Sequence, residues 1–155
     1  MNRLTPQKAA LFELTHNLRS EILAALQGED LSFSLGAQTL TLRQLLTEQG
    51  QIQASYTRLF ETLELTFDAS APGSLSTVPE FTAWFTRLDA DMWAALCALS
   101  NEQLDQPVQR GSHAVPLGMT FYTYRESVFI FAAKASVYLR ALGRELPKQV
   151  RGFVG

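Results

Sequence analysis

Histidine and cysteine are scarce in this chain, which has two histidines and one cysteine among 155 residues. A single cysteine, Cys97, excludes an internal disulfide and reads as a small core residue. His16 and His113 form no recognised metal-binding spacing, because His-x-x-x-His, His-Glu-x-x-His and Cys-x-x-Cys are all missing. The longest apolar run, Val128 to Ala133, is far too short to cross a bilayer. A net charge of −2 gives no electrostatic case for nucleic acid or an anionic membrane.

The remaining composition is that of an ordinary globular protein, with 46% hydrophobic and 18% charged residues. A chain of this length predicts one domain over residues 1–155, and such a domain buries a full core without disulfides or structural metals. The first residues, Met-Asn-Arg-Leu-Thr-Pro, have no apolar signal region, so we expect a cytoplasmic protein.

Apolar residues recur at helical spacing in four segments, so the sequence predicts four helices of roughly twenty residues each. The first covers about residues 6–26, with Thr5 as its N-cap. The second runs from Leu42 to about Glu64, with Thr41 as N-cap, and polar Gln49 and Gln53 fall inside its apolar stripe. The third begins at a capping box, Thr77-x-x-Glu80. The fourth covers about residues 119–142 and stops at Gly143.

The connections contain little regular structure in this interpretation. Residues 29–40 read as irregular or briefly extended, a short turn opens at Ser100, a small hairpin pairs residues 108–111 with 114–115, and the tail after Pro147 reads as extended. About a dozen residues join the second and third helices, a connection that reaches roughly 40 Å when extended. A twenty-residue helix is about 30 Å long, so these two helices have room to run parallel. The sequence therefore predicts an all-α four-helix bundle.

The last of the four helices is apolar over almost its whole circumference, through residues such as Phe129, Ile130, Val137 and Leu139. Such a helix is buried on more than one side. Either it is central to the bundle, or one of its faces meets a second subunit, and we expect a homodimer through this helix.

The end of that helix carries a recognisable motif. Tyr138-Leu139-Arg140-x-x-Gly143, with Pro147 four residues later, and the pattern Leu-Ser-x-Glu-x-Leu-Asp-x-Pro-Val at residues 99–108 resemble the DinB/YfiT-like four-helix-bundle family. The resemblance covers most of the chain. It implies an up-down-down-up bundle with a long crossover between its second and third helices, and it supports a dimer. It also implies a divalent metal bound by three histidines.

None of the three metal-ligand positions implied by the resemblance holds a histidine in this chain. Counting back from Tyr138 places two of them at Ser127 and Phe131, and the run Leu42-Arg-Gln-Leu-Leu-Thr-Glu48 places the third at Glu48, with Gln49 as the alternative register. Phenylalanine does not bind metals, and serine does so poorly. Losing two ligands on one helix removes a metal site, so we expect no metal and no other cofactor.

The same positions nevertheless predict a pocket. Ser127, Phe131, Lys134 and Tyr138 share one face of the fourth helix, and the resemblance sets Glu48 and Gln49 opposite them. The candidate pocket residues are therefore Glu48, Gln49, Ile52, Tyr124, Ser127, Phe131, Lys134 and Tyr138. Lys134 either pairs with Glu48 inside the bundle, extends its ammonium to the bundle edge, or acts as a catalytic lysine.

Three functional hypotheses follow. The favoured one is a DinB-like protein without its metal that binds a small ligand or has a non-catalytic dimeric role. The second is a metal- or thiol-dependent transferase or hydrolase that uses substitute ligands, such as Glu48 with one histidine. His16 is expected at the surface or edge of its helix and His113 in a solvated loop, and no spacing connects either of them to Glu48. The third is an interaction module that dimerises through the fourth helix.

Overall fold

All four helices expected from the apolar periodicity are present in the computed structural model, which describes residues 2–73 and 75–154. They are α1 (Thr5–Ala24), α2 (Leu42–Thr62), α3 (Val78–Ala98) and α5 (Leu117–Ala141). The predicted all-α bundle is therefore confirmed, with helix bounds that differ from the expected ones by a few residues. Within the described part of the chain, no helix combines the length and the apolarity that crossing a membrane requires.

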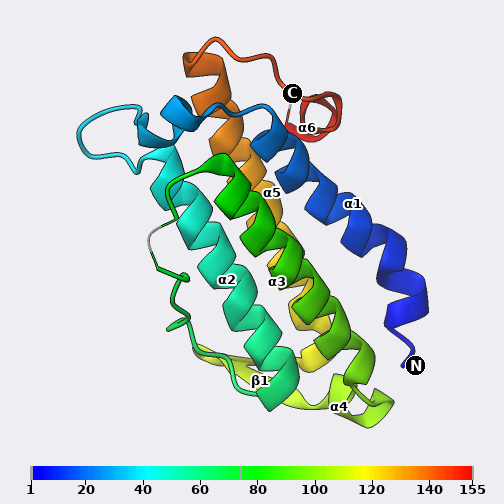
Figure 1. Cartoon of the computed structure of the whole chain (residues 1–155). Coiled ribbons are helices and arrows are strands. Elements are labelled where there is room, and N and C mark those ends of the chain that lie inside the picture. The colour runs from blue at the N-terminus through cyan, green and yellow to red at the C-terminus, as the bar shows by residue number, and fades with distance from the viewer. Residues whose placement is uncertain (1, 74, 155) are drawn as a thin grey trace.

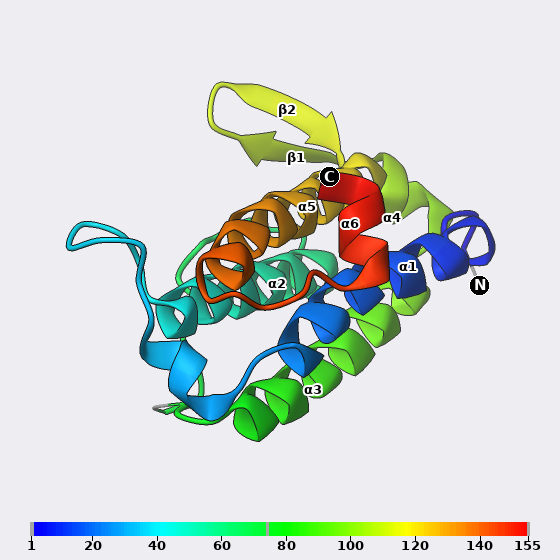
Figure 2. The ribbon, with the colours of Figure 1, turned by 90° about the horizontal axis from the view of Figure 1, so that it is seen from above.

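The four helices run up, down, down and up (Figure 1). The crossover, described over residues 63–73 and 75–77, runs back along the outside of the bundle, so that α2 and α3 lie parallel and side by side. On this crossover, Asp68 forms an ion pair with Arg58 of α2, and Thr66 accepts a hydrogen bond from the same guanidinium at 2.7 Å. Viewed from above, α1 contacts α3 and α5, and α2 contacts the same two helices, so α1 and α2 are diagonal partners (Figure 2).

Helix α1 begins differently from the prediction. Thr41 and Thr77 cap α2 and α3 as expected, but Thr5 lies inside α1, and its hydroxyl caps nothing. Asn2 provides the cap instead, because its Oδ1 accepts hydrogen bonds from the backbone N–H groups of Leu4 and Thr5, at 3.0 and 3.2 Å. The Asn2 amide also donates to two carbonyl oxygens at the end of α3, those of Leu96 and Leu99.

Short elements occupy the connections between the long helices. A 3₁₀ helix, η1 (Gly28–Ser32), follows α1, where the sequence suggested irregular structure. A five-residue helix, α4 (Asn101–Asp105), follows α3 at the expected turn. The expected hairpin is confirmed as β1 (Pro107–Arg110) and β2 (His113–Pro116), which are antiparallel.

The tail after Pro147 is helical, so the prediction of an extended tail is wrong. Helix α6 (Lys148–Val154) packs against α1 and α5 (Figure 2). Its Val150 is fully buried, and Phe153 stacks on Phe129 of α5, with 5.4 Å between ring centroids. This contact accounts for part of the broad apolar surface of α5, because α6 covers the side that carries Phe129.

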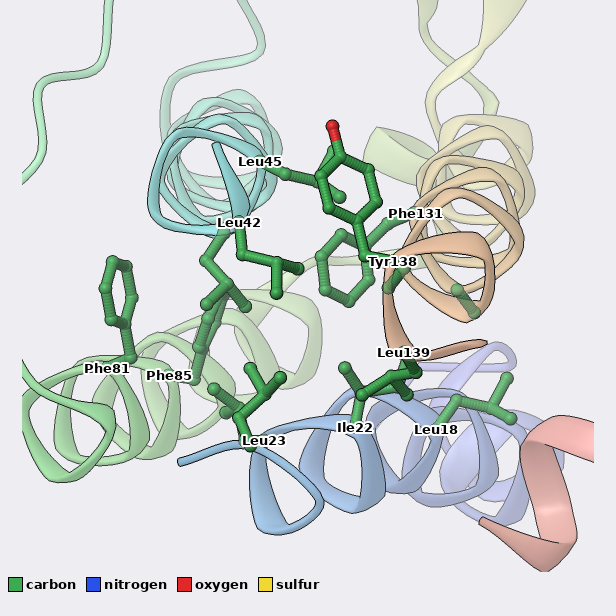
Figure 3. Close-up of a cluster of buried hydrophobic side chains, with 14 of the residues drawn as sticks. Leu18, Ile22, Leu23, Leu42, Leu45, Phe81, Phe85, Phe131, Tyr138 and Leu139 are labelled. Atoms are coloured by element: carbon green, nitrogen blue, oxygen red, sulfur yellow. The ribbon is translucent and has the colours of Figure 1, made fainter. Parts of the chain in front are cut away.

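The hydrophobic core consists of two clusters, one toward each end of the bundle. The Ile22 cluster lies near the end of α1 and the start of α2 and is drawn in Figure 3. The Phe121 cluster lies near the end of α2 and the start of α5. Polar side chains occupy the level between the two clusters, and the functional candidates lie there.

Candidate functional site

Five polar side chains form a layer across the interior of the bundle, with at least one from each long helix. The members of this polar layer are His16 and Arg19 of α1, Gln53 of α2, Asp89 of α3 and Tyr124 of α5. The apolar stripes of the helices exclude water from the interior at this level. Each of these polar groups therefore needs a hydrogen-bond partner within the layer.

Arg19 is the centre of the polar layer and is fully buried. One of its terminal nitrogens lies 2.8 and 2.6 Å from the two carboxylate oxygens of Asp89. The other donates to the side-chain oxygen of Gln53 at 2.7 Å, which joins the diagonal helices α1 and α2. The Gln53 amide in turn donates to Asp89 at 2.8 Å, and the guanidinium lies 4.1 Å from the ring centroid of Phe85. The buried charge is thus paired, hydrogen-bonded through both terminal nitrogens and stacked, while its Nε has no hydrogen-bond partner among the described residues.

His16 and Tyr124 complete the polar layer. The His16 Nε2 lies 2.6 Å from the Tyr124 hydroxyl, and its Nδ1 lies 3.1 Å from Asp89 Oδ1, without the alignment of a hydrogen bond. Burial, followed by the charge of Arg19, holds the pKa of His16 well below its ordinary value. Burial also raises the pKa of Tyr124. At neutral pH both groups are therefore uncharged. With the ring proton on Nδ1, which faces the Asp89 carboxylate, Nε2 accepts a hydrogen bond from the tyrosine hydroxyl.

This arrangement corrects two sequence expectations. His16 is 5% exposed and belongs to the interior, not to the surface or edge of its helix. Tyr124 is fully buried and points into the polar layer, so it does not line the pocket predicted for it. Arg19, His16 and Tyr124 are closed off from solvent, so these three side chains tie the helices together. Asp89 is the exception, because its side chain is 25% exposed and lines a hollow of about 150 Å³ between α1 and α3.

A cleft of about 120 Å³ lies between α2 and α5, at the level of the polar layer. Six of the eight predicted pocket residues line it, namely Glu48, Gln49, Ile52, Ser127, Phe131 and Lys134, and Leu45 and Ile130 complete the wall. Phe131 is 2% exposed and forms apolar wall, while the Ser127 hydroxyl donates to the Tyr124 carbonyl oxygen at 2.6 Å and keeps its lone pairs for another donor.

Gln49 is the unusual member of the cleft. It is 3% exposed, and its Nε2 has no hydrogen-bond partner among the described residues. A buried amide without a partner costs about 1–3 kcal/mol relative to a satisfied one. A wall of the cleft thus holds a donor that an incoming acceptor would satisfy.

Two exposed charges flank Gln49. Glu48 and Lys134 line the same cleft, and no ion pair joins them within the part of the chain that the structure describes. Lys134 is exposed, which favours the alternative with its ammonium at the bundle edge. Tyr138, the last predicted pocket residue, lies one turn further along α5, where its hydroxyl donates to the Leu40 carbonyl oxygen at 2.6 Å.

Comparison with known proteins finds similar folds but no similar sequences. No protein-family model matches the sequence, and no curated protein matches it. Among solved structures, a DinB-like protein from Bacillus subtilis, YjoA, superposes with a TM-score of 0.76 at 15% identity, over 92% of this chain and 97% of its own. The chain has the DinB-like fold. A DinB-like protein from Bacillus cereus ATCC 10987 gives a TM-score of 0.68 at 15% identity, over 86% and 89%.

The residues of the DinB-like cleft do not fit the metal that the resemblance implies. Of the three positions, Phe131 has no donor atom, Ser127 already donates to a carbonyl, and only Glu48 carries a carboxylate. The histidines do not compensate. His16 is held within the polar layer, and His113 belongs to β2 of the hairpin, which precedes α5 and contacts it. In the described residues, no group of three or more His, Cys, Asp or Glu side chains is placed to hold a metal ion.

Sequence reasoning found the cleft but missed the polar layer. Gln53 gave a signal, because a glutamine inside an apolar stripe must meet a polar partner. Arg19 and Asp89 gave weaker signals, since each stands beside a stripe leucine, Leu18 and Leu88. Only the packing of four helices shows that these side chains converge.

Proposed function

We propose that this chain is a cytoplasmic DinB-like protein that has lost the metal site and binds a small polar molecule in the cleft between α2 and α5. The unpartnered, buried amide of Gln49 is the observation that carries the proposal. A protein that used the cleft only for packing would gain stability by filling the Gln49 position with an apolar side chain. Retaining a donor there is explained by a ligand that accepts its hydrogen bond.

A ligand screen by NMR tests this proposal directly. Mixtures of small carboxylates, amines, amides and amino acids are added to the isotope-labelled full chain, and hits are located by shifts of cleft resonances. The variant Ser127→Phe fills the cleft, and we expect it to lose the hits. The matched control, Ala133→Phe, adds the same ring on the exposed face of α5 and should retain them. Hits that persist in Ser127→Phe would place binding elsewhere and overturn the proposal.

The variant Gln49→Leu is expected to affect stability and binding in opposite directions. Replacing a buried amide that lacks a partner should stabilise the unliganded protein by about 1 kcal/mol, while hits from the screen bind at least tenfold more weakly. Urea denaturation and NMR titration measure the two effects. Gln51→Leu, on the half-exposed side of the same helix, is the control and should change stability by at most about 0.5 kcal/mol.

Elemental analysis after dialysis against Zn²⁺ and Ni²⁺ tests the loss of the metal. We expect a metal-to-chain ratio near zero. A ratio near one would favour the enzymatic alternative with substitute ligands, and Glu48→Gln, His16→Gln and His113→Gln would then locate the site.

We also propose a homodimer through the outer face of α5. Met119, Ile130 and Val137 fall on one face of this helix and are 54%, 57% and 51% exposed, so this face leaves apolar side chains in water. Light scattering should give the mass of two chains, and Ile130→Asp should reduce it to one. A monomeric mass for the unaltered protein would contradict the dimer.

A further inference from the structure

A second hollow, of about 330 Å³, adjoins the cleft and shares Leu45 and Lys134 with it. One wall comes from the segment before α2, through Leu35, Thr39 and Leu40, and the other comes from α5, through Val137 and Tyr138. We call this hollow the apolar groove. Two of its lining residues, Leu45 of α2 and Tyr138 of α5, lie side by side in Figure 3.

The loop wall of the apolar groove is held in place by backbone contacts. Ser34 and Thr41 form an antiparallel bridge that closes the loop at its base. The Tyr138 hydroxyl, from the opposite wall, donates to the Leu40 carbonyl oxygen at 2.6 Å. The groove therefore exists before any ligand arrives, which reduces the ordering cost of binding.

Three large apolar side chains around this groove face water. Leu35, Leu40 and Val137 are 42%, 41% and 51% exposed. Val137 also lies on the α5 face proposed for the dimer, but Leu35 and Leu40 belong to the segment before α2. Isolated exposed apolar side chains are common, whereas a group of them around one hollow indicates a surface that an apolar group covers. The occupant of the groove thus has an apolar part.

The charges of the adjoining cleft define the other part of that occupant. A purely anionic head group would be attracted by Lys134 and repelled by Glu48. A purely cationic head group would be attracted by Glu48 and repelled by Lys134. A head group that carries both charges satisfies both side chains, and its carboxylate also offers an acceptor to Gln49 Nε2. Lys134 stands where cleft and groove meet, next to the point at which head and apolar part would join.

We propose that the cleft and the apolar groove together bind an α-amino acid with a large apolar side chain. The α-carboxylate lies toward Lys134 and Gln49, the α-ammonium toward Glu48, and the side chain in the apolar groove. The inference rests on the proposed ligand-binding function of the cleft and adds the class of ligand.

Four probe compounds separate the parts of this proposal. The labelled full chain is titrated with L-phenylalanine, 3-phenylpropionate, 2-phenylethylamine and glycine, and the methyl resonances of Leu35, Leu40, Leu45 and Val137 are followed. Phenylalanine should bind at least tenfold more tightly than each of the others. The propionate lacks the ammonium, the amine lacks the carboxylate, and glycine lacks the side chain.

Two charge variants test the assigned partners. Lys134→Met should weaken phenylalanine binding at least tenfold without weakening 2-phenylethylamine, and Glu48→Gln should do so without weakening 3-phenylpropionate. Both side chains are exposed, so the fold should persist. The matched controls are Lys148→Met on α6 and Glu61→Gln on α2, also exposed, and they should leave all affinities unchanged.

The remaining outcomes distinguish this inference from the proposed function. If 3-phenylpropionate or 2-phenylethylamine binds as tightly as phenylalanine, the cleft is a ligand site but the amino-acid assignment is overturned. If phenylalanine shifts no methyl resonance while another molecule from the screen occupies the cleft, the amino-acid assignment is also overturned, and the cleft remains a ligand site. If neither experiment finds a ligand, both proposals fail. Shifts of Leu35 and Leu40 that depend on protein concentration alone would show that a second copy fills the groove, and this also overturns the inference.

Discussion

At the scale of single residues, His16 makes the stability of the protein dependent on pH. Its folded-state pKa is well below that of the unfolded chain, mainly because of burial, so the unfolded state binds a proton first as the pH falls. The contribution of neutral His16 to the free energy of unfolding is therefore complete above about pH 6.5. Below that pH it decreases by about 1.4 kcal/mol per pH unit until the folded-state pKa is reached.

Urea denaturation between pH 7.5 and 5 measures this slope. His16→Gln, which keeps an acceptor for Tyr124, should remove it, whereas His113→Gln on exposed β2 should leave it unchanged. The pH range stops at 5 so that the titration of carboxylates such as Glu80 does not contribute to the slope. The backbone N–H groups of Ser76 and Thr77 lower the pKa of Glu80 to about 2, and the stability it contributes is complete above pH 4.5. A slope that survives in His16→Gln would contradict the assignment.

Asp89 should be the most sensitive residue of the polar layer. Asp89→Asn leaves the fully buried Arg19 without its counter-charge, so we expect a loss of about 3–5 kcal/mol in the free energy of unfolding. Asp91→Asn, exposed on the same helix, is the control and should cost at most about 0.5 kcal/mol. The double variant Arg19→Met with Asp89→Leu should cost less than Asp89→Asn alone, and a larger cost would contradict this electrostatic account.

At the scale of elements, Gly50 determines how closely α2 and α3 approach. A Cβ atom at this position would lie 2.2 Å from the ring of buried Trp84. Gly50→Ala should therefore destabilise the protein by about 1–3 kcal/mol, despite the better helix propensity of alanine. Gly152→Ala in α6 meets no atom within 4 Å and should be neutral or stabilising by up to about 1 kcal/mol. Equal effects in urea denaturation monitored by circular dichroism would refute the steric explanation.

The elements were predicted to different degrees, for physical reasons. Long helices such as α2 follow from periodicity and a capping threonine, which are local properties. Helix α6 was missed because seven residues are too short to be stable alone, and its formation depends on burying Val150 against α1 and α5. Six cleft residues followed from helical phase and the resemblance. Tyr124 was misplaced because periodicity does not show that His16, on another helix, draws its side chain inward.

At the scale of the whole molecule, α6 completes the bundle by covering the side of α5 that carries Phe129. Val150→Ala should lower the free energy of unfolding by about 1.5 kcal/mol, since it removes two buried methyl groups. Hydrogen exchange should quicken in α6 more than in α2. Lys148→Ala, exposed on the same helix, is the control. Uniformly faster exchange along the whole chain would show that α6 does not open separately.

The polar layer also determines how the helices are aligned along the bundle axis. Leucine-rich stripes pack almost as well after one helix slides past another by a turn, a shift of about 5.4 Å. Such a slide would set the Arg19 charge against hydrocarbon and separate Tyr124 from His16. Because all four long helices contribute to the layer, every misaligned packing carries that penalty, and only one alignment avoids it.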